Sequence, residues 1–423
     1  MMLKNMWVQR KSRTDKAEPR AWVSNLMSAL LVTFSSILAG ALVSGCNSDD
    51  EEALNPIDTA KMQQTVAELA EDMLVPGAVV ILHTPKGNFE YTFGVSQYGG
   101  SEPTRFDQHL RVGSNTKTWV GTIILQMVQE GKLQLDDPVA MHWTGVPSGE
   151  QITIAQLLSM ESGLHNYTTT LALNQILDQD PNKAWTQAEL LKLSFDSPLD
   201  FTPGTDFGYS NANTVLLGLI AQKLDDSTLP EIMLRRLFAP LGMTQTLFPE
   251  ITDNVLPEPY AHGYMYGTNV LTMDGALPEA MQQEARDGVI MPGEQTEANP
   301  SWGWAAGAGI STARELLVWV EALVGGKLLN EEMQKLRLAS VKPIDPDNPN
   351  TAYYGLGIAK FGQLYGHTGE LPGYNSFMGH DPENKVTLVV WTNMAPSVDG
   401  RDPATTIAAA LIKQLYRPVN SSN

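Results

Sequence analysis

Strand-like segments stand at both ends of this 423-residue chain, and a long helical stretch separates them. Near the start, residues 78–83 form a short apolar run, and residues 88–95 alternate well enough to pair with it as a hairpin. Towards the end, residues 354–360, 374–380 and 385–392 have the same character. Strands followed by helices and again by strands favour one sheet assembled from both chain ends. We therefore predict an α+β fold, in which helices flank an antiparallel sheet and a mainly helical subdomain is inserted.

The expected domain spans residues 59–418, with an α/β part at 59–130 and 301–418 and a helical part at 131–300. Apolar periodicity places helices near 57–72, 114–131 and 404–416, and others beginning near 152, 186 and 213. Residues 256–301 are rich in Pro, Gly and Met and lack a clear period. A segment of this kind is either a wall or lid over a cleft or a variable surface insertion.

The first 45 residues have the pattern of a secretion signal. Residues 1–20 are basic and polar, residues 21–45 are apolar and small, and the only cysteine, Cys46, follows at once. This junction resembles the lipobox of bacterial lipoproteins, which implies cleavage before Cys46 and lipid attachment to it. The apolar run is also long enough for a retained transmembrane helix. We expect an exported lipoprotein on the periplasmic side of a membrane, with residues 46–58 as an acidic, flexible tether.

Charge and histidine spacing exclude several function classes. The net charge is −19 although the first 45 residues are basic, so the body of the protein is strongly acidic. An acidic body disfavours nucleic-acid binding. The seven histidines show no spacing typical of a metal site, so we expect neither metal nor cofactor.

Ser114 and Lys117 are the first candidates for chemistry. They stand one turn apart where a strand end runs into a buried helix, so their side chains should share a face. A serine hydroxyl becomes a nucleophile when a base removes its proton, and a buried lysine with a lowered pKa can be that base. The alternative is a serine that only caps the helix.

Two later segments complete an ordered set. Residues 209–211 read Tyr-Ser-Asn, and residues 367–369 read His-Thr-Gly. With Ser114-x-x-Lys117, they resemble the three signatures of the serine penicillin-binding proteins and class C β-lactamases. The resemblance covers roughly residues 60–418, and further similar pieces lie at 131–139, 162–164, 240–243 and 308–313. It implies a β-lactamase/transpeptidase-like serine hydrolase domain.

The resemblance also implies roles for the residues of the set. Tyr209 would exchange a proton with Ser114 or the leaving group, provided that a Lys117 ammonium lowers its pKa from about 10. The backbone N–H groups of Ser114 and Glu370 would form the oxyanion hole. Asn211 would hold Lys117 or a substrate amide; the alternative is a turn or cap residue. His367 would relay a proton or support the network; the alternative is a merely packed histidine.

The remaining members of the third signature are Thr368 and Gly369, expected on a strand that lines the cleft, where Gly369 lets a substrate backbone approach. The sequence departs from the pattern of this family at three positions. His367 replaces the lysine usual in β-lactamases of this type, Glu161 stands where threonine is common, and Glu370 puts a carboxylate beside the oxyanion hole. We expect Glu370 to face solvent, because pointing inward it would oppose a developing negative charge.

The sequence therefore predicts a serine hydrolase that works through a Ser114 acyl-enzyme. A D-alanyl-D-alanine carboxypeptidase-like amidase of the cell envelope fits best, with a peptidoglycan stem peptide as substrate. An esterase or β-lactamase on the same scaffold is the alternative within the enzymes. A non-catalytic lipoprotein that binds cell-wall peptide or a protein partner is the alternative outside them.

Overall fold

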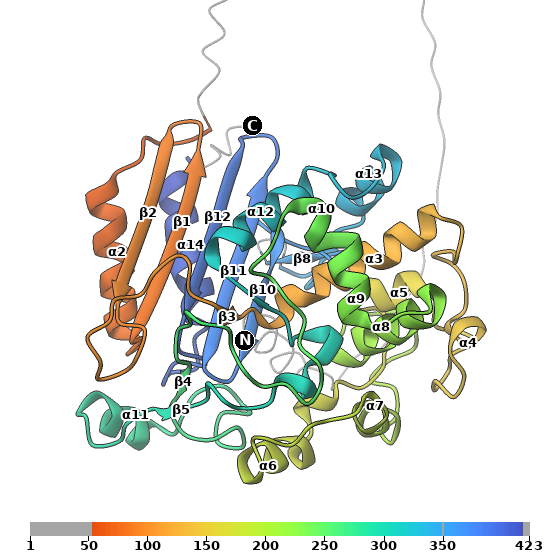
Figure 1. Cartoon of the computed structure of the whole chain (residues 1–423), viewed down its shortest axis with the longest axis horizontal. Coiled ribbons are helices and arrows are strands. Elements are labelled where there is room, and N and C mark those ends of the chain that lie inside the picture. The colour runs from red at the N-terminus through yellow and green to blue at the C-terminus, as the bar shows by residue number, and fades with distance from the viewer. Residues whose placement is uncertain (1–52, 349–350, 418–423) are drawn as a thin grey trace, which may run out of the picture.

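The computed structural model describes residues 53–348 and 351–417 and is built on one eight-stranded antiparallel sheet (Figure 1). The strand order is β2-β1-β12-β11-β10-β9-β8-β7, so the first strand of the chain pairs with the last. This arrangement confirms the predicted fold class. The strands are β1 (Gly77–Thr84), β2 (Gly87–Gly94), β7 (Lys342–Pro343), β8 (Tyr353–Tyr354), β9 (Ala359–Phe361), β10 (Leu364–Leu371), β11 (Tyr374–Asp381) and β12 (Val386–Thr392).

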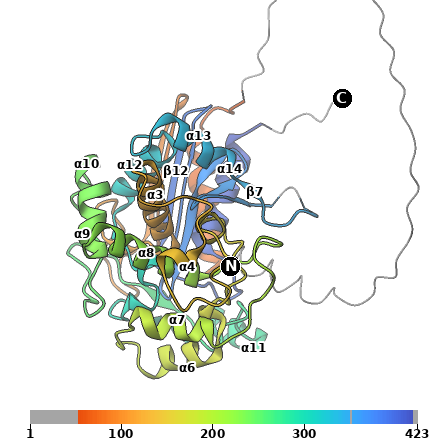
Figure 2. The ribbon, with the colours of Figure 1, turned by 90° about the vertical axis from the view of Figure 1, so that its right-hand side faces the viewer.

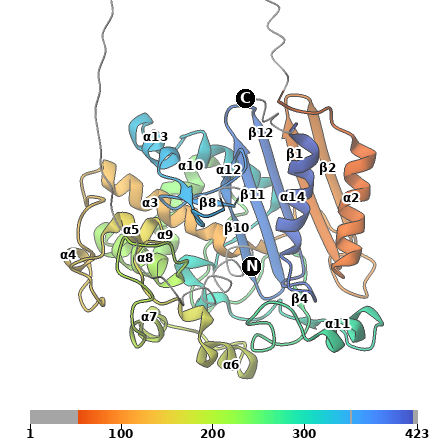
Figure 3. The same cartoon turned by 180° about the vertical axis from the view of Figure 1, so that it is seen from behind.

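Helices cover both faces of the sheet because β1 is apolar on both sides. Ala78, Val80 and Leu82 belong to the core shared with α2 (Thr59–Asp72) and α14 (Pro403–Leu415), which cover the face seen in Figure 3. Val79 and Ile81 belong to the core on the other face, with α3 (Thr116–Gln129) and α12 (Ala313–Val324). Successive strand residues point to opposite faces, so one strand can serve two cores.

The middle of the chain forms the helical part, which packs beside α3. Its helix α8 (Asn211–Asp225) contacts α3, α5 (Ile154–Leu158) and α7 (Gln187–Phe195). Figure 2 shows α6 (Leu171–Gln179) and α7 at the end of the molecule opposite α13 (Glu331–Ala339). Thr153 and Thr186 begin α5 and α7 with capping boxes, in which a threonine and the residue three positions on satisfy each other's backbone N–H. The helices are α4 (Val139–His142), α5 (Ile154–Leu158), α6 (Leu171–Gln179), α7 (Gln187–Phe195), α8 (Asn211–Asp225), α9 (Leu229–Met233) and α10 (Ala239–Leu241), with a π-helical turn, η3 (Leu234–Phe238), after α9.

Two expectations about local structure need correction. Residues 354–360 are not one strand, because a turn at Gly355–Gly357 separates β8 from β9. Gly357 has φ +65° and packs against the backbone of Gly121 in α3, where a side chain would not fit. Residues 256–301 are not a plain loop, since they contain β4 (Tyr264–Met265), β5 (Gly293–Glu294) and the amphipathic helix α11 (Glu279–Arg286).

The predicted signal, Cys46 and most of the predicted tether lie outside the described residues. Within residues 53–348 and 351–417, no helix has the length and apolar character needed to cross a membrane.

Candidate active site

Ser114 lies in a 3-10 turn, η1 (Gly113–Asn115), which leads directly into α3. Gly113 has φ +56°, and a Cβ there would collide with the backbone nitrogen of Glu370 in β10. Glycine therefore lets the turn press against β10. As a result, the backbone of Glu370 adjoins the segment that carries Ser114, as an oxyanion hole made from both residues would require.

Lys117 is buried and holds Ser114. Its Nζ lies 2.9 Å from Ser114 Oγ, 2.6 Å from Asn211 Oδ1 and 2.7 Å from the carbonyl oxygen of Ala306. No described carboxylate forms an ion pair with it, and burial lowers its pKa well below the usual value. A neutral amine donates two N–H bonds, which the two carbonyl oxygens accept. Its lone pair then faces the Ser114 hydroxyl, which is the geometry of a general base.

Tyr209 is half-buried, and its hydroxyl hydrogen-bonds the Ser114 side chain. Lys117 Nζ lies 4.8 Å from the centre of its ring. Burial raises the pKa of Tyr209, the Glu370 carboxylate raises it further, and the bond to Ser114 opposes this. The condition set from the sequence, a Tyr209 pKa lowered by a Lys117 ammonium, is therefore not met. Tyr209 keeps its proton and can donate it.

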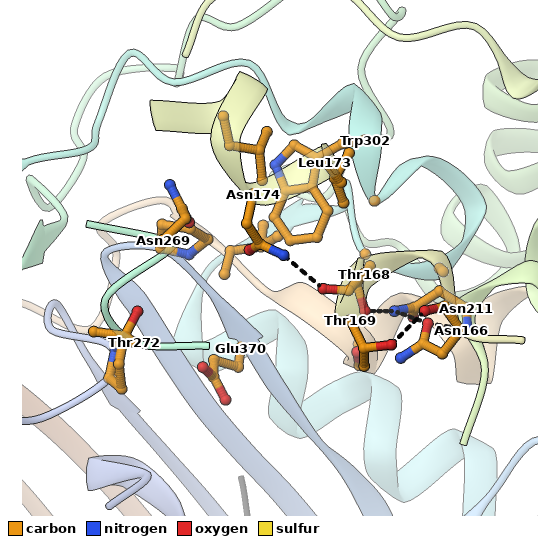
Figure 4. A pocket seen from close by; sticks show the side chains of 18 of the residues that line it. Asn166, Thr168, Thr169, Leu173, Asn174, Asn211, Asn269, Thr272, Trp302 and Glu370 are labelled. Carbon is orange, nitrogen blue, oxygen red and sulfur yellow. Dashed lines mark hydrogen bonds between the residues drawn. The ribbon is translucent and has the colours of Figure 1, made fainter. Parts of the chain in front are cut away.

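Asn211 begins α8 and fastens Lys117 to the helical part. Its Oδ1 accepts from Lys117, while its Nδ2 donates to Asn166 Oδ1 at 3.3 Å and to Thr168 Oγ1 at 3.1 Å (Figure 4). Of the alternatives from the sequence, the structure favours a residue that holds Lys117 over a turn or cap. Asn166 and Thr168 were missed, although they follow closely on residues 162–164.

His367 is buried in β10, and both of its ring nitrogens have partners. Nδ1 lies 2.6 Å from the Thr368 carbonyl oxygen, so it carries the proton, and Nε2 accepts from the Tyr354 hydroxyl at 3.0 Å. Burial lowers the pKa of His367 to about 3. A neutral ring with both nitrogens occupied supports the site rather than relaying protons. Tyr354, the third residue missed from the sequence, completes this support.

The two residues after Thr368 are placed differently from what we expected. A Cβ on Gly369 would collide with the carbonyl oxygen of Val112, so glycine admits the chain before Ser114 rather than a substrate. Glu370 does not face away into solvent, because it lines the cavity over Ser114 and its charge reaches Tyr209. Glu161, the other departure, bonds Ser159 and Lys342 and is not among the residues that line this cavity.

A cavity of about 180 Å³ opens over Ser114. Its walls come from α6, from the 256–301 segment and from the end of β10, so this segment is a wall of the cleft. Residues 53–348 and 351–417 contain no cluster of His, Cys, Asp or Glu that could hold a metal ion. Besides Ser114, Tyr209 and Asn211, the lining includes Leu173, Asn174, Met265, Asn269, Thr272, Trp302, Glu370 and Leu371.

Residues 62–412 match the sequence model of the beta-lactamase family. The chain belongs to the beta-lactamase family. This membership and the geometry above make it a serine hydrolase. It is 24% identical to penicillin-binding protein 4* of Bacillus subtilis (strain 168) over 347 aligned residues. The aligned region covers 79% of this chain and 71% of that protein. It spans about two thirds of the length of the curated relatives it matches.

Two solved structures are similar to this member of the beta-lactamase family. A D-stereospecific amidohydrolase from Streptomyces sp. is 28% identical with a TM-score of 0.71, covering 84% of this chain and 98% of its own. The D-amino acid amidase from Ochrobactrum anthropi SV3, solved with D-phenylalanine, is 25% identical with a TM-score of 0.68, covering 84% and 99%.

Proposed function

We propose that the protein is an amidohydrolase that forms an acyl-enzyme at Ser114 on substrates built from D-amino acids. The observation that carries the proposal is the 2.9 Å contact between Ser114 Oγ and Lys117 Nζ, in a site where burial lowers the pKa of the amine and so favours its neutral form. A serine that only caps a helix would not need a buried amine held by two carbonyl oxygens.

The geometry supports a two-step acyl transfer. Lys117 removes the proton of Ser114 as its oxygen attacks the substrate carbonyl, and Tyr209 donates a proton to the departing amine. The backbone N–H groups of Ser114 and Glu370 stabilise the oxyanion, each by about 2.7–4 kcal/mol. Lys117 passes the Ser114 proton to Tyr209 as the amine leaves, so both groups are neutral again. Lys117 then takes a proton from the water that attacks the acyl-enzyme, and Tyr209 gives its proton to Ser114 Oγ as the acyl bond breaks and is reprotonated from Lys117.

The similarity to a D-stereospecific amidohydrolase and a D-amino acid amidase supports an amide of a D-amino acid as substrate. The similarity to a penicillin-binding protein supports the version of this function predicted from the sequence, a D-alanyl-D-alanine carboxypeptidase.

A comparison of the protein with its Ser114→Ala variant tests the proposal. The substrates are a D-amino acid amide, nitrophenyl esters and a fluorescent penicillin. Ser114-dependent release of ammonia from the amide is the expected result. Ester turnover alone would indicate an esterase, and rapid penicillin turnover a β-lactamase. If no substrate gives a Ser114-dependent signal, the proposal is overturned and the alternative of a non-catalytic binding protein is favoured.

We further propose that the mature chain is anchored through a lipid on Cys46, on the periplasmic side of a membrane. The motif before Cys46 supports this, since it joins an apolar run of small residues to the only cysteine of the chain. Radiolabelled palmitate should enter the wild type in a bacterial host and not the Cys46→Ser variant. Equal labelling of both would overturn the anchor.

A further inference from the structure

Tyr209 packs against a small apolar cluster that joins the helical part of the domain to the sheet. Tyr209 stands between α7 and α8, where the structure has neither helix nor strand, so no regular backbone pairing sets its position. Contacts between side chains must set it instead. The cluster has a buried centre and a partly buried rim, and its members are Met160, Ile344, Ala352, Tyr354 and Ala359 in the centre and Phe207, Tyr209 and Phe361 on the rim.

Tyr354 is the member of this cluster that meets Tyr209 edge to face. The two ring centres lie 6.2 Å apart, and the ring planes are 88° from parallel. The Tyr354 ring also lies 5.9 Å from that of Phe207, two positions before Tyr209. Aromatic rings attract each other in the perpendicular arrangement, because the positive edge of one faces the negative surface of the other. Tyr354 therefore restricts both the ring of Tyr209 and the chain segment that carries it.

Tyr354 is itself fixed to the sheet. It is 2% exposed, and its hydroxyl donates to His367 Nε2 at 3.0 Å. Its strand, β8, pairs with β9, and β9 pairs with β10, which carries His367. The 3-10 turn that contains Ser114 packs against the same strand β10. One buried ring thus links Tyr209 to the strand beside Ser114.

We propose that Tyr354 is a positioning residue, which holds the Tyr209 hydroxyl where it can give a proton to the leaving group. This inference rests on the proposed function. The proton moves from Tyr209 to the departing nitrogen or oxygen as its bond to the carbonyl carbon breaks, and Lys117 replaces it with the proton taken from Ser114. An amine or an alkoxide needs this proton in order to leave, whereas nitrophenolate leaves without it. Displacement of Tyr209 should therefore slow only reactions with basic leaving groups.

Three substrates with the same acyl group test this role: D-alanine amide, D-alanine methyl ester and D-alanine p-nitrophenyl ester. Each is measured as kcat/KM, which covers the steps up to formation of the acyl-enzyme. Tyr354→Leu removes the ring and should lower kcat/KM for the amide and the methyl ester by about tenfold to hundredfold. The p-nitrophenyl ester should change little. Tyr354→Phe keeps the ring and should recover most of the loss.

Phe361→Leu is the matched control. Phe361 packs against the same cluster, but its ring contact is with Phe377, at 5.4 Å. The control should lower stability in urea unfolding and leave the ratio of ester to amide rates unchanged. Urea unfolding also shows whether Tyr354→Leu is folded, and Tyr354→Met takes its place if it is not.

A double variant shows whether Tyr354 acts through Tyr209. In a Tyr209→Phe background the proton donor is already gone, so adding Tyr354→Leu should cost the amide and the methyl ester little more. An equal loss with and without the Tyr209 hydroxyl would overturn the positioning role.

The outcomes separate this role from the proposed function. Loss of Ser114 dependence for every substrate would overturn the acyl-enzyme and the positioning role with it. Turnover of both esters but not of the amide would overturn the amidohydrolase, while the two esters would still test Tyr354. If turnover depends on Ser114 and a folded Tyr354→Leu protein slows all substrates equally, or none, the positioning role is wrong.

Discussion

Replacing Asn211 by aspartate would place a charge against Lys117 with almost no change in shape. The oxygen that accepts from Lys117 Nζ lies 2.6 Å away and would become part of a carboxylate. Two unit charges at this separation attract by about 6 kcal/mol at an effective dielectric constant of 20. Desolvation of the new carboxylate offsets much of that attraction. A carboxylate beside a cation typically moves a titration by about 1–3 pH units.

The sign of the change follows from the role of Lys117. It accepts the proton of Ser114 only when neutral, and burial lowers its pKa in the wild type. The acid limb of kcat/KM should therefore move to higher pH by about 1–3 units in Asn211→Asp. The variant should also lose about 1–3 kcal/mol of stability, because Asn166 Oδ1 would face a carboxylate oxygen in place of an N–H donor.

The assay is hydrolysis of nitrophenyl acetate across the pH range, with the Ser114→Ala rate subtracted as background. Asn211→Ala is the matched control, since it removes the same hydrogen bond without adding a charge; its rate should fall with no upward move of the acid limb. Urea unfolding shows whether each variant is folded. A folded Asn211→Asp protein with an unmoved acid limb would refute Lys117 as the titrating base.

Further predictions concern support of the site. The pKa of His367 is about 3 in the folded protein and near 6.5 in the unfolded chain. Its contribution to the free energy of unfolding is therefore fully present above pH 6.5 and should fall by about 1.4 kcal/mol per pH unit between pH 6.5 and 3. In unfolding measurements across this range, His367→Gln should flatten that slope. Asp178 accepts hydrogen bonds from the backbone and side-chain N–H groups of Asn269, which lies in the cavity wall. In steady-state kinetics, Asp178→Ala should therefore raise KM severalfold and leave kcat nearly unchanged. An unchanged KM would contradict this prediction. Gly369→Ala should cost about 1–3 kcal/mol in urea unfolding, because its Cβ would collide with the Val112 carbonyl; wild-type stability would show that this packing is loose.

Local patterns were enough to predict the layout of the fold. The apolar run that became β1, the helical period after Ser114 and the strand-like runs that became β11 and β12 depend on neighbours within a few residues. The structure has these elements where the patterns predict them. The spacing of Ser114 and Lys117 likewise determines that they share a helix face. Where a turn rather than periodicity decides the backbone, as at Gly355–Gly357, the pattern predicted the wrong element.

Only the tertiary structure decided the electrostatics of the site. Whether Lys117 is neutral, whether Tyr209 keeps its proton and whether Glu370 points inward depend on burial and on partners such as Ala306, which lies far away in the sequence. The sequence shows the residue types, but desolvation is a property of everything packed around them. The chain alone therefore predicted Ser114 as the nucleophile and indicated the family, and the folded environment determined the pKa shifts and the charge of the cavity.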